Sequence, residues 1–447
     1  MNRIKRVFVA NRGEIALRIV TACQELGLEA VVGFSEADRG GLAARRADRA
    51  VCIGPAPAAQ SYLREDLVVQ AALGTGCDAI HPGYGFLSES PKLASRAREH
   101  GLTFVGPPAG VIELSGDKLR AREEAARAGV PVLPGREVAS GAEARRAAQD
   151  IGYPVLVKAA GGGGGRGIKL AHDADELDAL LTLARSEAGA AFGDDRLYLE
   201  RFIASARHVE VQIAADEHGA VIHLGERACS VQRRYQKVIE EAPAPALEPA
   251  TRNALTAAAV AFARAIGYQN LGTVEFVLDA NTGEYFFLEV NARIQVEHPV
   301  TEAVTGRDLV ALQLRIADGE PLGFAQADVV FDGHAIECRL NAEDVAHGFM
   351  PSPGTLSLFS VPELLQLRVD TDLCAGSVIP PYYDSMMAKL IAHAEGRGAA
   401  IDVLQEALED LDVEGVETNR MLLISILGHD DFHRGAVTTD WLERAIV

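Results

Sequence analysis

Two glutamates and an asparagine in the segment GTVEFVLDANTGEYFFLEVN have the types and spacing of a metal site. The turn signal at 281–283 separates two runs rich in β-branched and aromatic residues, which predicts a β-hairpin. Pairing about Thr282 would place Glu275 opposite Glu289, with Asn291 further along the same face. Carboxylates opposed in this way repel by a few tenths to about 1 kcal/mol unless a cation compensates. Because carboxylate and amide oxygens suit Mg²⁺, the three residues are candidate ligands.

The register of this hairpin decides whether the glutamates meet. The same pairing predicts two apolar cross-strand pairs, Leu278 with Phe286 and Phe276 with Leu288. A bulge at Gly283 would slip the register by one residue and separate the carboxylates. In the alternative interpretation, the glutamates simply face solvent.

Three polar side chains alternate directly after the hairpin, in the stretch RIQVEH: Arg293, Gln295 and Glu297. If the stretch is extended, they line one face beyond the proposed metal site. A guanidinium group binds a planar oxyanion through two parallel hydrogen bonds, and a neighbouring carboxylate can accept the proton of that anion. Arg339 lies on another polar strand face, in AIECRLN, and no spacing in the sequence brings it to the same pocket.

Five consecutive glycines, 161–165, lie between two predicted strands, with Lys158 before them and Arg166 after them. Since glycine has no Cβ, successive backbone N–H groups can approach an oxyanion closely. A flexible linker is the alternative, but a linker would separate domains, whereas this run interrupts two β segments. The pattern therefore favours a mobile loop that covers phosphate groups.

A further strand, RHVEVQIAAD, alternates cleanly between polar and apolar residues. His208, Glu210 and Gln212 share one face, and aliphatic residues share the other. The stretch VQRRYQK that follows adds Lys237 to a cluster of polar and basic residues. A solvent-exposed charged loop is the alternative interpretation of that cluster.

The elements that must position these residues follow from length and periodicity. A chain of 447 residues predicts about three domains at about 150 residues each. Residues 5–34 read as strand, turn, helix and strand, and the alternation continues to about residue 110, which predicts a doubly wound parallel sheet. Residues 131–204 predict a compact α/β unit, and alternating strands follow it.

Charge and cysteine usage exclude several classes of protein. The 43 basic and 63 acidic residues give a formal charge of −20, which argues against a broad nucleic-acid or anionic-membrane face. The six scattered cysteines contain no CxxC pair, so we expect neither a zinc site nor disulfides. Apolar runs such as 421–427 are far shorter than the ~18–20 residues of a membrane span, and no signal peptide is visible. A cytoplasmic protein is expected.

The ordered set of motifs resembles the biotin carboxylases, ATP-grasp enzymes that serve acyl-CoA, pyruvate and related carboxylases. The resemblance rests on GGGGGRG, RHVEVQ, VQRRYQK, TVEF, LEVNARIQVEHPVTE and ECRLNAED, and it extends to HPGYGFLSE and PPYYDSM near the two ends. The stretch IQVEHPVTE separates this family from other ATP-grasp ligases. The implied fold mixes α/β and α+β units: an N-terminal doubly wound parallel-sheet domain (1–114), an ATP-grasp core (115–331) with a mobile lid (131–204), and a C-terminal mixed β domain (332–447).

The resemblance also implies roles for individual residues. The implied ATP-binding residues are Lys118, Lys158, Gly164, Gly165, Glu200, Arg201, Phe202, Ile203, His208, Gln232, Tyr235, Glu275 and Glu289. The implied ligands of Mg²⁺ or Mn²⁺ are Glu275, Glu289 and Asn291. The implied bicarbonate-binding groups are Lys237, Arg293, Gln295 and the backbone of Val296. Glu297 is the implied general base, and Arg339 would bind biotin and stabilise its anion, so that Lys237, Arg293, Glu297 and Arg339 form the implied catalytic set.

Four positions depart from the commonest family pattern. Tyr235 stands where histidine is usual, and a phenol cannot carry the charge of an imidazolium. Arg201 replaces a common lysine but can still donate hydrogen bonds, so we expect adenine binding to survive. Val290 and Ala292 give EVNAR in place of EMNTR, a version that also occurs in the family.

The implied function is ATP-dependent carboxylation of biotin by bicarbonate, through carboxyphosphate. This is the first half-reaction of an acyl-CoA carboxylase, and acetyl-CoA carboxylase in fatty-acid synthesis is the first expectation. No Met-Lys-Met tripeptide occurs, so biotin is expected on a separate carrier protein, with carboxyltransferase subunits as further partners and a homodimer by resemblance. Two alternatives are an ATP-grasp ligase that joins another carboxylate to an amine, and a non-catalytic nucleotide-binding module.

Overall fold

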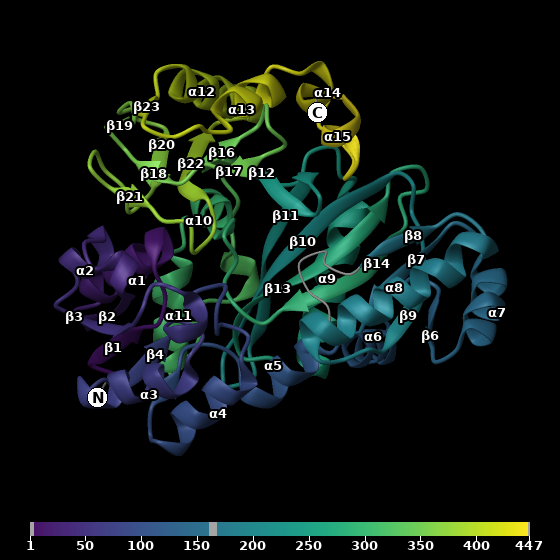
Figure 1. The fold of residues 1–447 in the computed structure, drawn as a ribbon, viewed down its shortest axis with the longest axis horizontal. Coiled ribbons are helices and arrows are strands. Elements are labelled where there is room, and N and C mark those ends of the chain that lie inside the picture. Colours follow the sequence, from purple (N-terminus) through teal and green to yellow (C-terminus); the bar gives the residue numbers. More distant parts are fainter. Residues whose placement is uncertain (1–3, 161–167, 446–447) are drawn as a thin grey trace.

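The structure is a computed structural model that describes residues 4–160 and 168–445 (Figure 1). The predicted phosphate-covering loop, including Gly164 and Gly165, lies outside the described residues. In the part of the chain that is described, no helix combines the length and apolar character needed to cross a membrane.

The N-terminal part forms a five-stranded parallel sheet, as the alternation of strand and helix predicts. Its strands run in the order β3-β2-β1-β4-β5. Helix α1 covers it by burying Ile15, Ile19 and Cys23, which recur at helical spacing. The strands are β1 (Arg6–Val9), β2 (Glu29–Ser35), β3 (Arg49–Gly54), β4 (Ala79–His81) and β5 (Thr103–Phe104). The helices are α1 (Gly13–Glu25), α2 (Leu42–Arg46), α3 (Glu65–Gly74), α4 (Pro91–Glu99) and α5 (Ala109–Gly116).

An eight-stranded antiparallel sheet forms the centre of the molecule. Its strands run in the order β14-β13-β10-β11-β12-β15-β22-β20, so the sheet continues across residue 332 through the pairing of β12 with β15. These strands are β10 (Ala206–Ala215), β11 (Val221–Arg233), β12 (Gln236–Ala242), β13 (Asn270–Asp279), β14 (Tyr285–Asn291), β15 (His334–Asn341), β20 (Leu367–Asp370) and β22 (Met386–Ala394). The helices that follow its strands are α9 (Pro249–Ala265), α10 (His298–Thr305) and α11 (Leu309–Ala317).

A smaller unit protrudes at the far end of the molecule from the N-terminal sheet (Figure 1). It contains a separate four-stranded sheet, in the order β6-β9-β7-β8, and its own apolar core. Its elements are β6 (Gly135–Val138), α7 (Gly141–Ile151), β7 (Val155–Ala159), β8 (Lys169–Ala171), α8 (Ala174–Phe192) and β9 (Leu197–Arg201). Helix α6 (Lys118–Arg127) precedes it.

Short strands and helices complete the C-terminal part and pack on one face of the central sheet. The remaining strands are β16 (Glu343–Asp344), β17 (Met350–Pro351), β18 (Gly354–Thr355), β19 (Leu358–Ser360), β21 (Val378–Ile379) and β23 (Asp412–Glu414). The remaining helices are α12 (Arg397–Glu409), α13 (Arg420–Leu427), α14 (Asp430–Arg434) and α15 (Trp441–Ala445). They bury a large aliphatic core against β15 and β22.

The β13–β14 hairpin confirms the predicted glutamate pair, but its loop length and its register near the loop differ from the prediction. The backbone N–H of Asp279 donates to the carbonyl of Glu284 at 2.8 Å, so the loop spans 280–283 and not three residues. Glu275 nevertheless lies opposite Glu289. The longer loop shifts the register by one residue, and a bulge in one strand shifts it back before the glutamates.

The predicted apolar pairs of this hairpin are wrong by one residue. Phe276 pairs with Phe287, and Leu278 pairs with Tyr285. The bulge at Leu288 restores the register before Glu289, because it adds one residue to β14 only. Two deviations of one residue, in the loop and in the strand, therefore cancel at the glutamates.

Candidate active site

Basic side chains of the protein itself surround the opposed glutamates. Lys118, at the start of α6, places Nζ 2.6 Å from Oε2 of Glu289. The two oxygens of Glu275 lie 3.2 Å from Nζ of Lys237 and 3.0 Å from Nε2 of His208. Burial raises the pKa of Glu275, but Lys237 and His208 outweigh it and hold the pKa well below its ordinary value. Both neighbours therefore favour an ionised Glu275.

Asn291 joins the glutamates on the same face. Its amide Nδ2 donates to Glu275 at 2.8 Å, and its Oδ1 accepts from Arg293 at 2.9 Å. Two carboxylates and one amide oxygen at one edge form the hard oxygen donor set that Mg²⁺ prefers. The residues present fit a magnesium ion.

The polar face of β10 is buried. Glu210 is fully buried and accepts from Nε of Arg227 at 2.6 Å and from Lys237 at 2.6 Å. Arg227, also fully buried, donates to Gln212 at 2.8 Å. The alternation placed Glu210 beside His208 but gave it no role, and nothing in the sequence pointed to Arg227.

Glu297 lies where the central sheet brings two cations together. Its two oxygens accept from Lys237 at 2.6 Å and from Arg339 at 2.8 Å. Burial raises the pKa of Glu297, but the two cations hold it well below its ordinary value. Arg339 reaches this point because β15 lies next to β12 in the sheet. It is also held by Nε donation to Glu240 at 2.7 Å.

The segment after β14 is a turn, so the predicted extended face at 293–297 is wrong. Strand β14 ends at Asn291, and Glu297 is the N-cap of α10. Pro299 in the first turn favours a helix start there, since its missing N–H is not needed. The bend still brings the side chains together, because Arg293 donates to Gln295 at 2.7 Å.

The N-terminal part also reaches this turn. Glu89 accepts from Nε of Arg293 at 3.0 Å and from the backbone N–H of Ala292 at 3.1 Å. The guanidinium of Arg293 thus has a fixed orientation, with Gln295 and Asn291 on its other donors. The sequence showed no link between Glu89 and this arginine.

The remaining candidates for nucleotide binding lie on the protruding unit and its border. Lys158 on β7 forms a buried ion pair with Glu200 on β9, and Arg122 lies 3.0 Å from the same carboxylate. The strands align Leu156 with Glu200, so this ion pair lies within the four-stranded sheet. Of the next three candidates, Ile203 is buried and Arg201 and Phe202 are partly exposed.

Gln232 and Tyr235 lie on the β11–β12 hairpin. Gln232 is buried and pairs across the strands with Lys237. Tyr235 lies at the tip with 53% of its surface exposed. It and Arg234 form a two-residue loop in which both have positive φ, +65° and +46°, an uncommon conformation for residues other than glycine.

Family models match all three parts of the chain. "Biotin carboxylase, N-terminal domain" matches residues 3–112, and "Biotin carboxylase C-terminal domain" matches residues 337–444. "Carbamoyl-phosphate synthase L chain, ATP binding domain" matches residues 117–325. The matched ranges together cover most of the chain.

Individual relatives are similar in sequence to this chain over nearly its full length. The chain is 48% identical to biotin carboxylase 1 of Bacillus subtilis over 442 residues, 98% of each chain. It is 46% identical to one of the pyruvate carboxylase subunits of Methanothermobacter thermautotrophicus, covering 98% of this chain and 89% of that protein.

Solved structures share the fold. Biotin carboxylase from Campylobacter jejuni is similar with a TM-score of 0.96 and 42% identity, covering 99% of each chain. The biotin carboxylase domain dimer of Hydrogenobacter thermophilus 2-oxoglutarate carboxylase, in complex with MgADP, ADP and bicarbonate, is similar with a TM-score of 0.95 and 46% identity, covering 99% of this chain and 97% of that one. The parallel N-terminal sheet, the ATP-grasp core and the mixed C-terminal part are those of an enzyme family, and the chain belongs to the biotin carboxylases.

Proposed function

We propose that this chain uses ATP to carboxylate biotin with bicarbonate. The observation that carries the proposal is the buried carboxylate of Glu297, paired with Lys237 on one oxygen and with Arg339 on the other. Arg293 and Gln295 lie in the same turn, so anion-binding donors and a base are adjacent. A nucleotide-binding module without turnover would have no use for this arrangement.

In the proposed reaction, Lys237, Arg293, Gln295 and the backbone of Val296 bind bicarbonate. Glu297 accepts the bicarbonate proton as the oxyanion attacks the γ-phosphate of ATP, which releases ADP and forms carboxyphosphate. Carboxyphosphate then breaks down to carbon dioxide and phosphate. The bound bicarbonate of the Hydrogenobacter relative supports an anion site of this kind.

Nucleotide binding is proposed for the border between the protruding unit and the central sheet. Lys118, Lys158, His208 and Glu200 would contact ATP, and Glu275, Glu289 and Asn291 would hold Mg²⁺. A bound magnesium ion neutralises charge on the phosphates during transfer. The protruding unit would act as the mobile lid, which excludes water from the labile intermediate. The MgADP in the Hydrogenobacter relative supports this proposal.

In the second step, the released phosphate takes the proton from the ureido nitrogen of biotin. The resulting anion attacks carbon dioxide to form the new carbon–nitrogen bond, and Arg339 stabilises the negative charge on the ureido oxygen. The position of Arg339 next to Glu297 supports a biotin site beside the bicarbonate site.

We propose acetyl-CoA carboxylation in fatty-acid synthesis as the pathway, with biotin on a carrier protein and a carboxyltransferase as second enzyme. The support is the resemblance to relatives named simply biotin carboxylase. A homodimer is proposed because the Hydrogenobacter relative is a domain dimer. Reconstitution with carrier and carboxyltransferase subunits, supplied with acetyl-CoA, pyruvate or 2-oxoglutarate in turn, identifies the acceptor, and sedimentation identifies the dimer.

The decisive experiment is an ATPase assay on the purified chain. ATP hydrolysis should require bicarbonate and should rise when free biotin or a biotinylated carrier is added, with radiolabelled bicarbonate appearing as carboxybiotin. Hydrolysis that needs another carboxylate and an amine would instead identify a different ATP-grasp ligase. Absence of turnover under all these conditions would instead indicate a nucleotide-binding module that does not hydrolyse ATP.

A further inference from the structure

Lys389 on β22 carries a fully buried ammonium group beside the turn that leads to Glu297. Its Nζ donates to the carbonyl of Val296 at 3.0 Å and lies 3.1 Å from Oε2 of Glu14. Burial lowers the pKa of Lys389, but Glu14 and the other nearby carboxylates raise it above its ordinary value. The group is therefore a charged donor to a backbone carbonyl.

The contacts of Lys389 come from three distant parts of the chain. Glu14 belongs to α1 of the N-terminal part, and its other oxygen accepts from the hydroxyl of Tyr84. Val296 belongs to the turn before α10, and Asp370 on β20 lies 3.7 Å away. Lys389 thus connects the N-terminal part, the C-terminal end of the sheet and the turn at 292–297, which we call the catalytic turn.

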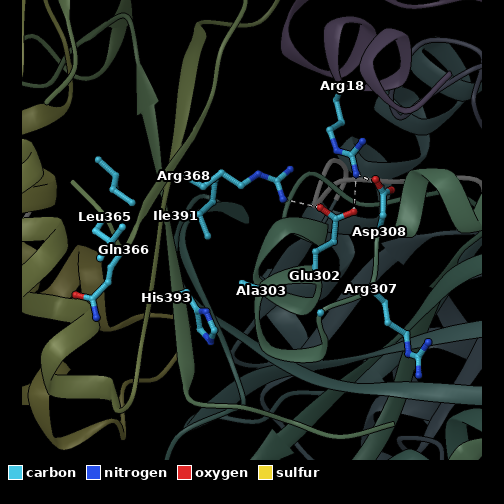
Figure 2. A pocket seen from close by; sticks show the side chains of 12 residues that line it. Arg18, Glu302, Ala303, Arg307, Asp308, Leu365, Gln366, Arg368, Ile391 and His393 are labelled. Carbon is cyan, nitrogen blue, oxygen red and sulfur yellow. Dashed lines mark hydrogen bonds and ion pairs between the residues drawn. The ribbon is translucent and has the colours of Figure 1, made fainter. Parts of the chain in front are cut away.

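Asp370 lies farther from the ammonium group than Glu14 does, 3.7 Å against 3.1 Å, and Arg368 also holds it. Arg368 donates to Asp370 at 2.7 Å and to Glu302 on α10 at 2.7 Å. Figure 2 shows Arg368 and Arg18 pointing to the two oxygens of Glu302 from two different directions. These side chains line a hollow of about 520 Å³. The network leaves Glu14 and Val296 as the close partners of Lys389.

Stability alone does not explain a buried charge here. Taking an ammonium group out of water costs several kcal/mol, and replacing a whole buried ion pair by apolar side chains of similar volume is often as stable. The ammonium group instead fixes a position, because its N–H donor holds the carbonyl oxygen of Val296 at one point. The carbonyl of Val296 defines the peptide plane between Val296 and Glu297, and hence where the Glu297 side chain begins.

We propose that Lys389 is a positioning residue for bicarbonate activation: held by Glu14, it fixes the Val296 carbonyl and so aims Glu297 at the anion. The inference rests on the proposed function and deepens it. Lys389 touches no reacting atom, and its effect passes through the turn. Misplacement of a catalytic group by about 1 Å costs on the order of 10²-fold in rate.

The test compares Lys389→Met with Lys389→Arg by steady-state kinetics. Lys389→Met should lower kcat/KM for bicarbonate by about 10²-fold, while KM for ATP stays close to that of the wild type. Lys389→Arg should recover part of the loss, because guanidinium keeps a charge and N–H donors. If the role of Lys389 were purely structural, Lys389→Met would lower the melting temperature and would affect the kinetics for bicarbonate and for ATP alike.

Arg252→Met is the matched control. Arg252 also pairs with a carboxylate, Glu226 at 2.7 Å, and donates to a backbone carbonyl, that of Ala244 at 3.0 Å, but it lies on α9 away from the turn. This variant should keep the wild-type kcat/KM for bicarbonate.

A folded Lys389→Met variant with wild-type kcat and KM for bicarbonate overturns the proposal. If that variant does not fold, Glu14→Gln replaces it, since Lys389 then loses its closest carboxylate. A raised KM for bicarbonate in Glu14→Gln supports the positioning role, and an unchanged one overturns it. An inactive wild type would contradict the proposed function instead, before any variant is compared.

Discussion

Glu297 accepts a cation on each oxygen, which keeps it ionised but also makes it a weak base. We expect bicarbonate to change this balance: when the anion draws Lys237 toward itself, Glu297 loses part of its stabilisation and its pKa rises toward the working range. The first prediction follows from that role. Lys237 and Arg339 keep Glu210 and Glu240 as partners when Glu297 is removed, so folding should survive.

Glu297→Ala should therefore fold and bind ATP, yet lose bicarbonate-dependent turnover by about 10²–10⁴-fold, as for a lost general base. ADP release in the presence of bicarbonate and biotin measures the turnover, and circular dichroism checks the fold. Glu297→Gln is the control for packing, because it keeps the side-chain shape without the base. Turnover near that of the wild type in either variant would remove Glu297 from the role.

Glu289 gives a second prediction at the same scale. Glu289→Gln removes one candidate metal ligand but leaves an amide oxygen to accept from Lys118, so the fold should change little. The Mg²⁺ concentration needed for half-maximal rate should rise clearly at fixed ATP. Glu284→Gln, an exposed position on the same hairpin, is the control and should leave the Mg²⁺ dependence unchanged. Normal Mg²⁺ dependence in Glu289→Gln would contradict the metal site.

Glu337 gives a third prediction, in pH dependence. It is fully buried on β15 opposite Glu240, and neither of its side-chain oxygens has a hydrogen-bond partner among the described residues. Burial, reinforced by Glu240, raises its pKa well above the ordinary value although Lys389 lowers it. A raised pKa in the folded state means that the folded protein binds the proton more tightly than the unfolded chain does. The stability from Glu337 is thus fully present in acid and is lost as the pH rises.

Glu337→Gln removes this titration and imitates the protonated acid. Its free energy of unfolding should be close to that of the wild type near pH 5 and should exceed it increasingly at higher pH. Urea unfolding of both proteins at pH 5, 7 and 8.5 measures the difference, in which the titrating groups that do not interact with Glu337 cancel. A difference that does not change with pH would show that Glu337 is ionised throughout.

At the scale of elements, the protruding unit has a separate sheet and its own apolar core, so its stability can be changed by itself. Leu177→Ala in α8 removes a fully buried side chain and should cost about 2–5 kcal/mol of local stability. We expect faster cleavage of this unit by a protease and a higher KM for ATP, with the central sheet intact. Leu183→Ala, on the same helix but 47% exposed, is the control. Equal effects of the two variants would contradict an independent unit.

At the scale of the whole molecule, the N-terminal part reaches the turn at 292–297 through two ion pairs. Glu89 and Glu14 approach that turn through Arg293 and Lys389. The Glu89 pair is partly exposed, so its contribution should stay below about 1 kcal/mol. Glu89→Gln should accordingly raise KM for bicarbonate by no more than about five-fold and leave kcat nearly unchanged. Loss of kcat by orders of magnitude would mean that Glu89 acts in the chemistry.

Local patterns were sufficient for many elements of this protein. The parallel N-terminal sheet and strands β7, β8 and β9 of the protruding unit follow from periodicity within each segment, because burial of one face is decided by neighbours in the sequence. Strand β6 was not predicted. The glutamate pair followed from a hairpin, which is also local. Even there, the loop length and the bulge at Leu288 were not predicted, because backbone hydrogen bonding decides them.

The amino-acid sequence by itself determined which residue types could do the chemistry, and the resemblance indicated which positions carry it. Only the tertiary structure decided which of them meet. Arg339 reaches Glu297 because β15 pairs with β12, and Lys389 reaches Val296 because β22 pairs with β15. Pairing of distant strands depends on burial and hydrogen bonding summed over the whole sheet. No spacing along the chain records that sum, so these contacts could not be predicted from local patterns.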